Sequence, residues 1–234
     1  MILVAIVLIG ALTAAIQSTN RSEGTGIDRE QLVIRASEVQ RYASELERAV
    51  NYIMQDGKSE SDIRFAHPDA HSDYGDLSAD ADPSDQVFHV SGGGAQYRVS
   101  PGDIHSSTGN QWEFYAGTHI PGMGTASRAE LIAVLPNVTD AFCEKINELN
   151  GQTGTPTDTG AAAAAGSSAG DCLTVGALGR FGGGQTFYSG SDMNSVDETS
   201  FAQDPTTSAA RPAPQACVVC ASGGNHFYHV LLAR

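Results

Sequence analysis

The chain begins with an apolar run, residues 1–16, that carries no charged side chain, and it turns polar directly afterwards. A helix over this run would be roughly 24 Å long, whereas a helix of the ~20 residues that a bilayer needs is about 30 Å long. An apolar helix of this kind needs a cover, either lipid or other copies of itself. The pattern therefore predicts that the protein is a subunit of an assembly.

A second helix is predicted over residues 27–56, after a polar, glycine-containing joint at residues 17–26. Its apolar positions recur at alternating steps of four and three residues, and Gly57 follows its last turn. Two packings stay open: the helix packs wholly on its own domain, or one part packs on the head and another part on neighbouring subunits. The apolar seam consists of Leu32, Ala36, Val39, Ala43, Leu46, Val50 and Ile53.

The remaining residues, 57–234, predict a small head that contains short strands. Strands are expected where β-branched and aromatic residues stand between glycine-rich turn signals. These segments are residues 86–90, 95–99, 111–115 and 227–232.

Two short helices are also expected in the head. Ser127 and Glu130 have the spacing of a capping box, which predicts a helix that Pro136 stops, and a further helix is predicted over residues 138–149. The predicted fold class is α+β, with a long N-terminal helix and a loop-rich α+β head. Polar or low-complexity sequence predicts exposed loops at residues 67–85, 152–170 and 192–215.

Charge limits the possible partners. The formal net charge is −14, and the 13 Lys and Arg residues form no basic stripe. Because a nucleic-acid partner needs such a stripe to neutralise phosphates, this composition argues against nucleic acid. Charged residues make up only 17% of the chain, while Gly, Ser, Thr, Ala and Asp are plentiful, as is typical of exported surface proteins.

The cysteines form an even set of four: Cys143, Cys172, Cys217 and Cys220. An even set predicts two disulfides in an oxidising compartment, with buried free thiols as the alternative. We expect Cys143 to pair with Cys217 or Cys220, because this bridge would hold the last strand. A local Cys217–Cys220 pair with Cys143–Cys172 is the alternative, and the sequence leaves all three connectivities open.

Candidate metal sites lack part of the pattern that they require. His67 and His71 stand four residues apart, but Pro68 disfavours the helix that would put both on one face, so we expect no zinc site. Carboxylates between residues 69 and 85 offer oxygen ligands for calcium, yet without an EF-hand loop a solvated acidic loop is favoured. They are Asp69, Asp73, Asp76, Asp80, Asp82 and Asp85.

Motifs for catalysis are incomplete in the same way. Cys217 and Cys220 have C-x-x-C spacing but lack a second pair or a following histidine, which favours structural disulfides over redox chemistry. The glycine triplets at residues 92–94 and 182–184 lack the lysine of a phosphate loop. We therefore expect no enzymatic activity and no cofactor.

The order of these features resembles the type IV pilin and pseudopilin superfamily, in which an apolar N-terminal helix continues into an amphipathic one and a disulfide-containing head. Three segments are similar to alphaproteobacterial pilin-like proteins: ILVAIVLIGALTAAI at the start, LPNVTDAFCEKIN at residues 135–147, and HFYHVLLAR at the end. The family has a basic leader and a glutamate at the fifth mature position, where this chain has Ala5. Three explanations stay open for this difference: a leader was removed before Met1, residues are missing before Met1, or the protein is a divergent relative.

The resemblance implies a structural subunit of an extracellular type IV pilus-like filament. Such a subunit passes through the inner membrane and then polymerises with copies of itself through its N-terminal helix. The alternatives are a membrane-anchored pseudopilin-like component of a secretion system and a tethered exported binding protein or hydrolase. The polymer core would contain Ile2, Val4, Ile6, Val7, Ile9, Gly10, Ala11 and Ala14, of which the small residues allow close helix approach.

Overall fold

The structure of the chain is a computed structural model. It describes residues 29–107, 111–152, 157–158, 173, 180–181, 187, 189, 193–196, 213–220 and 224–234. The expected polymer core and joint, Cys172, and most of residues 152–170 and 192–215 lie outside these ranges.

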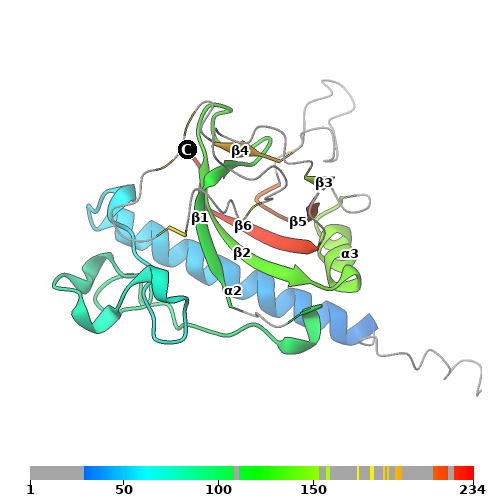
Figure 1. Cartoon of the computed structure of the whole chain (residues 1–234), viewed down its shortest axis with the longest axis horizontal. Coiled ribbons are helices and arrows are strands. Elements are labelled where there is room, and N and C mark those ends of the chain that lie inside the picture. The colour runs from blue at the N-terminus through cyan, green and yellow to red at the C-terminus, as the bar shows by residue number, and fades with distance from the viewer. Residues whose placement is uncertain are drawn as a thin grey trace, which may run out of the picture.

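The protein has an α+β fold, in which a long helix runs along one side of a sheet (Figure 1). Short 3₁₀ turns lie between the long helix and the first strand, at Glu60–Asp62, Ser72–Tyr74, Leu77–Ala79, Pro83–Asp85 and Gly102–Ile104. The helices and strands are α2 (Arg29–Gln55), β1 (Glu113–His119), β2 (Glu130–Val138), α3 (Asp140–Leu149), β3 (Thr157–Asp158), β4 (Asn194–Ser195), β5 (Gln215–Cys220) and β6 (Asn225–Leu232).

The sheet has the order β3-β5-β6-β2-β1-β4. Its four longer strands, β5, β6, β2 and β1, pair antiparallel with their neighbours. The two-residue strands β3 and β4 add short parallel pairings at the two edges. The strands therefore form a four-stranded antiparallel sheet with short additions at each side.

Helix α2 confirms the predicted amphipathic helix. All seven residues of the seam are buried, from Leu32 at 8% exposed to Ile53 at 0%. The helix ends in a Schellman motif, in which Gly57 has a φ of +89° and the Lys58 N–H donates to the Ile53 carbonyl at 3.4 Å. The sequence leaves two packings open for this helix. The seam packs on the chain's own domain, since it lies against β6 and α3.

The sheet carries a hydrophobic cluster on each face, because alternate strand residues point to opposite sides. The first cluster lies on the α2 side and takes Trp112, Phe114, Leu131, Ala133, Leu135, Cys217 and Phe227 from the sheet region. The second cluster lies on the other side and contains Tyr115, Ile120, Ile132, Val134, Leu173, Val196, Ala213, Ala216, Val218, Tyr228 and Val230. Positions inside the expected loops 152–170 and 192–215 thus join the sheet or core: Thr157 pairs with β5, and Val196 and Ala213 are buried.

Two expected strands are wrong. Residues 86–90 and 95–99 form turns and irregular backbone instead of ladders. Their glycines let the loop fold back on itself, since the Gly93 N–H donates to the Gln86 carbonyl at 2.9 Å. A Cβ atom on Gly93 would stand 2.7 Å from the Ala49 Cβ, so only glycine lets this loop approach α2 closely.

The helix predicted from Ser127 is also wrong, because this segment belongs to strand β2. Glu130 does not cap a helix. Its carboxylate accepts the Ile120 N–H at 2.7 Å and lies 3.3 Å from the His119 ring. Pro136 does not end an element either, since it stands where the β2–β6 register shifts and no ladder N–H is needed.

Other local predictions are confirmed with small shifts. The helix over residues 138–149 is α3, and the Thr139 hydroxyl caps it by accepting the Phe142 N–H at 3.3 Å. The C-terminal strand is β6, which begins two residues earlier than expected. The strand expected over residues 111–115 is displaced to Glu113–His119 as β1.

Candidate functional site

The start of α2 is the place where the predicted apolar run and joint, residues 1–26, would connect to the described part of the chain. Its first turns extend past the sheet on the side of α3 (Figure 1). An ion pair of 3.9 Å between Arg29 and Glu148, both exposed, marks the contact with α3. Three large apolar side chains near this end are exposed: Val33 at 40%, Ile34 at 56% and Leu149 at 47%.

A buried histidine fixes α2 to the sheet. The His229 Nε2 on β6 lies 2.8 Å from the Glu47 carboxylate on α2, and its Nδ1 lies 3.3 Å from Gln215 on β5. Burial lowers the pKa of His229, and the hydrogen bond to Glu47 opposes this shift. The imidazole thus joins three elements in one hydrogen-bonded contact, which favours a rigid attachment of helix to head.

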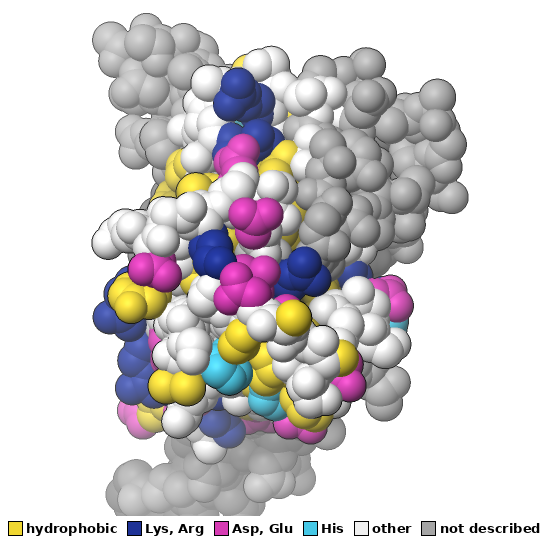
Figure 2. Space-filling model, turned by 90° about the vertical axis from the view of Figure 1, so that its left-hand side faces the viewer, with side chains coloured by type: hydrophobic (Ala, Val, Ile, Leu, Met, Phe, Trp, Pro, Cys, Tyr) yellow, Lys and Arg dark blue, Asp and Glu magenta, His cyan; other side chains and the backbone are white. Residues whose placement is uncertain are grey.

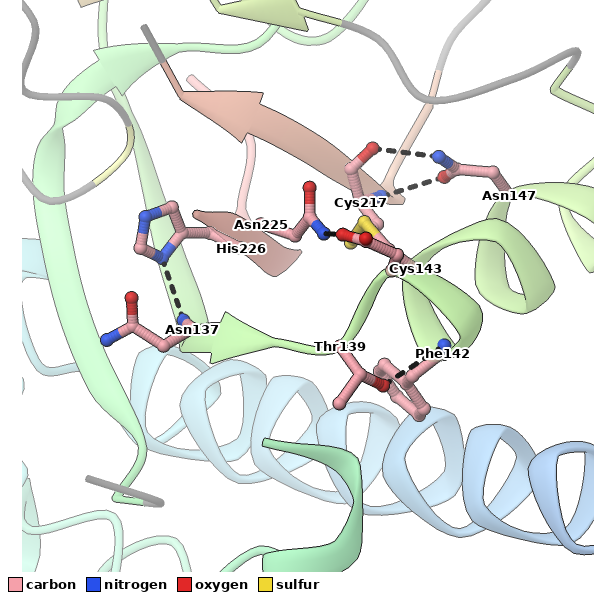
Figure 3. Close-up of a disulfide and its surroundings, with 9 residues drawn as sticks. Asn137, Thr139, Phe142, Cys143, Asn147, Cys217, Asn225 and His226 are labelled. Atoms are coloured by element: carbon pink, nitrogen blue, oxygen red, sulfur yellow. Dashed lines mark hydrogen bonds between the residues drawn. A yellow bond between two sulfur atoms is a disulfide. The ribbon is translucent and has the colours of Figure 1, made fainter. Parts of the chain in front are cut away.

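A disulfide joins α3 to β5. Cys143 and Cys217 are bonded with a Cα–Cα distance of 5.2 Å, and both residues are fully buried (Figure 3). Asn147, one turn further along α3, accepts the Cys217 N–H at 2.8 Å and donates to the Cys217 carbonyl at 2.9 Å. The bond and the amide together hold α3 flat against the sheet edge.

This bridge is one of the two that the sequence predicts for Cys143. It excludes the arrangement in which Cys143 pairs with Cys172 and Cys217 pairs with Cys220. Cys172 and the side chain of Cys220 lie outside the described residues. A second bond between Cys172 and Cys220 is the remaining pairing, and it stays a prediction.

The acidic residues considered for calcium do not converge. Within the described ranges there is no cluster of three or more His, Cys, Asp or Glu side chains that is arranged to hold a metal ion. Asp82 pairs with Lys58 at 2.6 Å, and Asp85, which is buried, pairs with Arg64 at 3.1 Å. On the face drawn in Figure 2, acidic and basic side chains likewise stand next to each other.

The two histidines considered for zinc act as local turn caps. The Nδ1 atoms of His67 and His71 accept the N–H groups of Asp69 and Asp73 at 3.1 and 3.2 Å. The His67 ring also stacks on Tyr97, with ring centroids 4.6 Å apart. Each ring therefore orders its own loop.

The described surface includes two hollows that the sequence did not reveal. One, of about 200 Å³, lies between α2 and residues 98–101, where Arg98 is already paired with Glu45 and stands over the Tyr42 ring. The other, of about 320 Å³, lies on the opposite side of the sheet, beside Arg180 and His226. No motif indicates the second hollow, because its residues come from segments far apart in the sequence.

No family model, no curated protein and no solved structure matches the chain. Among the described helices, none is long and apolar enough to cross a membrane.

Proposed function

We propose that the protein is a structural subunit of an extracellular, type IV pilus-like filament, and that it polymerises through its N-terminal residues 1–16. The observation that carries this proposal is the combination of a head-bound helix with an apolar run that precedes it in the sequence, on the other side of the polar joint. Helix α2 has 27 residues and would be about 40 Å long, so it is a stiff connection between the head and the preceding residues.

The physical driving force would be burial of the apolar run. Covering residues 1–16 stabilises the assembly by on the order of 20–30 kcal/mol per subunit as an upper estimate, at about 1.5–3 kcal/mol for each large side chain. A subunit waiting in the inner membrane already hides this surface in lipid. Assembly therefore exchanges lipid contacts for helix contacts, which Gly10, Ala11 and Ala14 would allow to be close.

The surroundings of α2 support the same proposal. Its seam lies entirely within the chain's own core, so the seam offers little surface for a partner. The exposed Val33 and Ile34 stand at the end of α2 nearest the apolar run. Apolar side chains in residues 1–16 and exposed apolar side chains in the first turns of α2 both fit subunits that pack side by side.

The compartment agrees with an exported subunit. The buried Cys143–Cys217 bond needs an oxidising environment to form and persist. We propose that the subunit reaches the cell surface through the inner membrane, that its partners are copies of itself, and that it has no enzymatic role.

The test is a pair of substitutions at one position of the apolar run. Val7→Asp would place an unpaired charge in the polymer core, which costs several kcal/mol for each subunit, whereas Val7→Leu keeps the position apolar. We expect Val7→Leu cells to yield a sheared, pelletable fraction and Val7→Asp cells to yield none, with the Cys143–Cys217 bond formed in both.

Pelletable material from Val7→Asp at the wild-type level would show that residues 1–16 do not drive assembly. No pelletable material from any version, with normal membrane insertion, would instead favour the membrane-anchored secretion component.

A further inference from the structure

A polar hollow of about 320 Å³ lies on the face of the sheet away from α2. Its walls come from three strands and from one residue of a distant segment. The residues that matter for its chemistry are Gln111, Glu113, Tyr115, Asn137, Arg180 and His226.

The strand pattern explains why these residues meet. Trp112 and Phe114 belong to the first cluster, so Glu113 and Tyr115 point to the opposite side of β1. On β6, His226 points the same way as Tyr228, which belongs to the second cluster. The hollow is therefore the polar end of the face that carries the second cluster.

A bulge in β2 places Asn137 at the hollow. The β2–β6 register shifts between Leu135 and Val138, and Asn137 has a φ of +54°, the left-handed region. No other non-glycine residue in the described ranges has a positive φ. Bulges and left-handed residues re-aim side chains, and they concentrate at functional sites.

The bulge also sets which ring nitrogen of His226 carries the proton. The Asn137 N–H donates to the His226 Nδ1 at 3.3 Å, and the second ring nitrogen turns away from Asn137 (Figure 3). His226 is 7% exposed, and burial lowers its pKa to about 4. The ring is thus neutral at physiological pH and carries its proton on Nε2, which makes Nε2 a hydrogen-bond donor.

Opposite charges cancel on the other wall. The Arg180 guanidinium donates to both oxygens of Glu113, at 2.5 and 3.1 Å, and to Asp73 at 2.9 Å. Tyr74 donates its hydroxyl to the same Glu113 carboxylate at 2.8 Å. Within the described part of the chain, three of the five guanidinium donors are engaged and two remain for a ligand.

We infer that this hollow is a binding site for a neutral, polyhydroxylated ligand, namely a single sugar ring. Asn137 offers an amide group that both donates and accepts, and Gln111, whose amide nitrogen already donates to the Asp69 carbonyl at 2.7 Å, keeps its second N–H and its oxygen. His226 and Arg180 add donors. The C–H face of a sugar would lie against Tyr115. Such a mixed set of donors and acceptors, in which the Arg180 cation is already paired with Glu113 and Asp73, suits hydroxyl groups, which donate and accept at the same atom.

Other ligand classes fit less well. An anion would find Arg180 already neutralised by Glu113 and Asp73. A cation would find the Glu113 oxygens already bonded to Arg180 and Tyr74. An apolar ligand would leave buried polar groups unpaired, at a cost of about 1–3 kcal/mol each. The volume lies near the lower end of the ~300–1,000 Å³ range of ligand sites, which suits one ring.

The inference does not rest on the filament proposal, because the Val7 substitutions leave these residues unchanged. The test uses the full chain in detergent and saturation-transfer NMR with millimolar glucose, galactose, mannose and N-acetylglucosamine. Immobilised glycans that end in the same sugars separate a surface glycan from a free sugar as the source. Glucose 6-phosphate and glucosamine keep the ring but add a charge of either sign.

The decisive variant is Asn137→Gly, which keeps the left-handed backbone and the N–H to His226 but removes the side-chain amide. Gln111→Ala is a second variant outside the bulge, and Gln55→Ala, at the exposed end of α2, is its matched control. We expect at least one neutral sugar to bind, and both hollow variants to weaken it about fivefold while Gln55→Ala leaves it unchanged.

Three results would overturn the inference. The first is the absence of binding by every neutral sugar in both formats. The second is tighter binding of a charged analogue than of its neutral parent. The third is equal binding by wild-type protein and by folded Asn137→Gly and Gln111→Ala proteins.

Discussion

One face of the β5-β6-β2-β1 sheet is covered by the long helix α2, whose seven seam residues are all buried, together with α3 and loop residues such as Phe65. The opposite face is covered in pieces, by Leu173, Val196 and Ala213 from segments far apart in the sequence. The first cover is built around one long helix, and its buried residues form a single cluster with the sheet. The second leaves room for the polar hollow beside His226 and Arg180. A sheet can thus be structural on one side and open to a ligand on the other.

The two covers differ in what holds them. Helix α2 is fixed by its own seam and by the His229–Glu47 contact. The pieces over the second face stand in the sequence between Cys143 and Cys217, so the disulfide closes the loop that supplies them. The comparison predicts that loss of the disulfide loosens the packing on the second face more than the packing on the α2 face.

The largest expected effect comes from breaking this bond. A Cys143→Ser/Cys217→Ser double variant should lose about 4 kcal/mol of unfolding free energy, since the bond joins residues separated by 74 positions. Chemical denaturation without reductant measures this loss. Hydrogen exchange should rise at Val196 and Ala213 before it rises along α2.

A loss below about 1 kcal/mol, or earlier exchange along α2 than at Val196, would contradict this dependence.

The next effect compares the two faces within one strand. Leu135 faces α2 and Ile132 faces the second cluster, and both are fully buried. We expect Leu135→Ala and Ile132→Ala to cost similar amounts, about 3 kcal/mol each, because each leaves a cavity in a closed core. Thermal or urea unfolding of the two variants gives the comparison.

If Ile132→Ala costs less than about 1 kcal/mol, the second face is not a packed core and its cover is loose.

The pH dependence of stability should also differ between the faces. Burial lowers the pKa of His226 to about 4, whereas the effect of burial on the pKa of His229 is opposed by Glu47. As the pH falls below about 6.5, His226 therefore binds a proton in the unfolded chain but stays neutral in the folded protein. Its stabilising contribution is complete above pH 6.5 and is lost as the pH falls towards 4. Between pH 7 and pH 5 the loss should be roughly 2 kcal/mol.

His226→Gln should remove that loss, and His229→Gln should change the pH profile less. Equal pH profiles for wild-type protein and His226→Gln would show that this imidazole is not protected from protonation.

The smallest effect is expected on the outer surface of α2. Ile34 is 56% exposed, so Ile34→Ala should change the unfolding free energy by less than about 0.5 kcal/mol. Denaturation of the head measures this change. A cost above about 1 kcal/mol would mean that this side of α2 also has a cover, and the one-sided account of the helix would be wrong.

The same comparison explains what the sequence could reveal. The seam of α2 repeats along one segment, so the spacing of Leu32, Val39 and Leu46 predicts it directly. Strand β2 is buried on both faces, so its sequence lacks the alternation of apolar and polar residues that would predict a strand. Glu130 then resembles a capping residue, although its carboxylate is buried and accepts the Ile120 N–H.

The hollow was not predictable for a related reason. Arg180 and Glu113 are 67 residues apart, and His226 and Asn137 are 89 apart, so no local motif contains them. The sequence did contain one hint, since Asn137 after Pro136 is a residue type that tolerates left-handed backbone. What that bulge faces depends on the strand register, which a single sequence does not give.

The central claim is that the chain assembles into filaments, and one measurement tests it most directly. Negative-stain electron microscopy of material sheared from cells that express the wild-type chain should show long filaments of uniform width. Immunogold labelling with antibodies against the head should decorate them along their length. Single particles or membrane fragments alone, from cells in which the exported chain is abundant, would contradict the account.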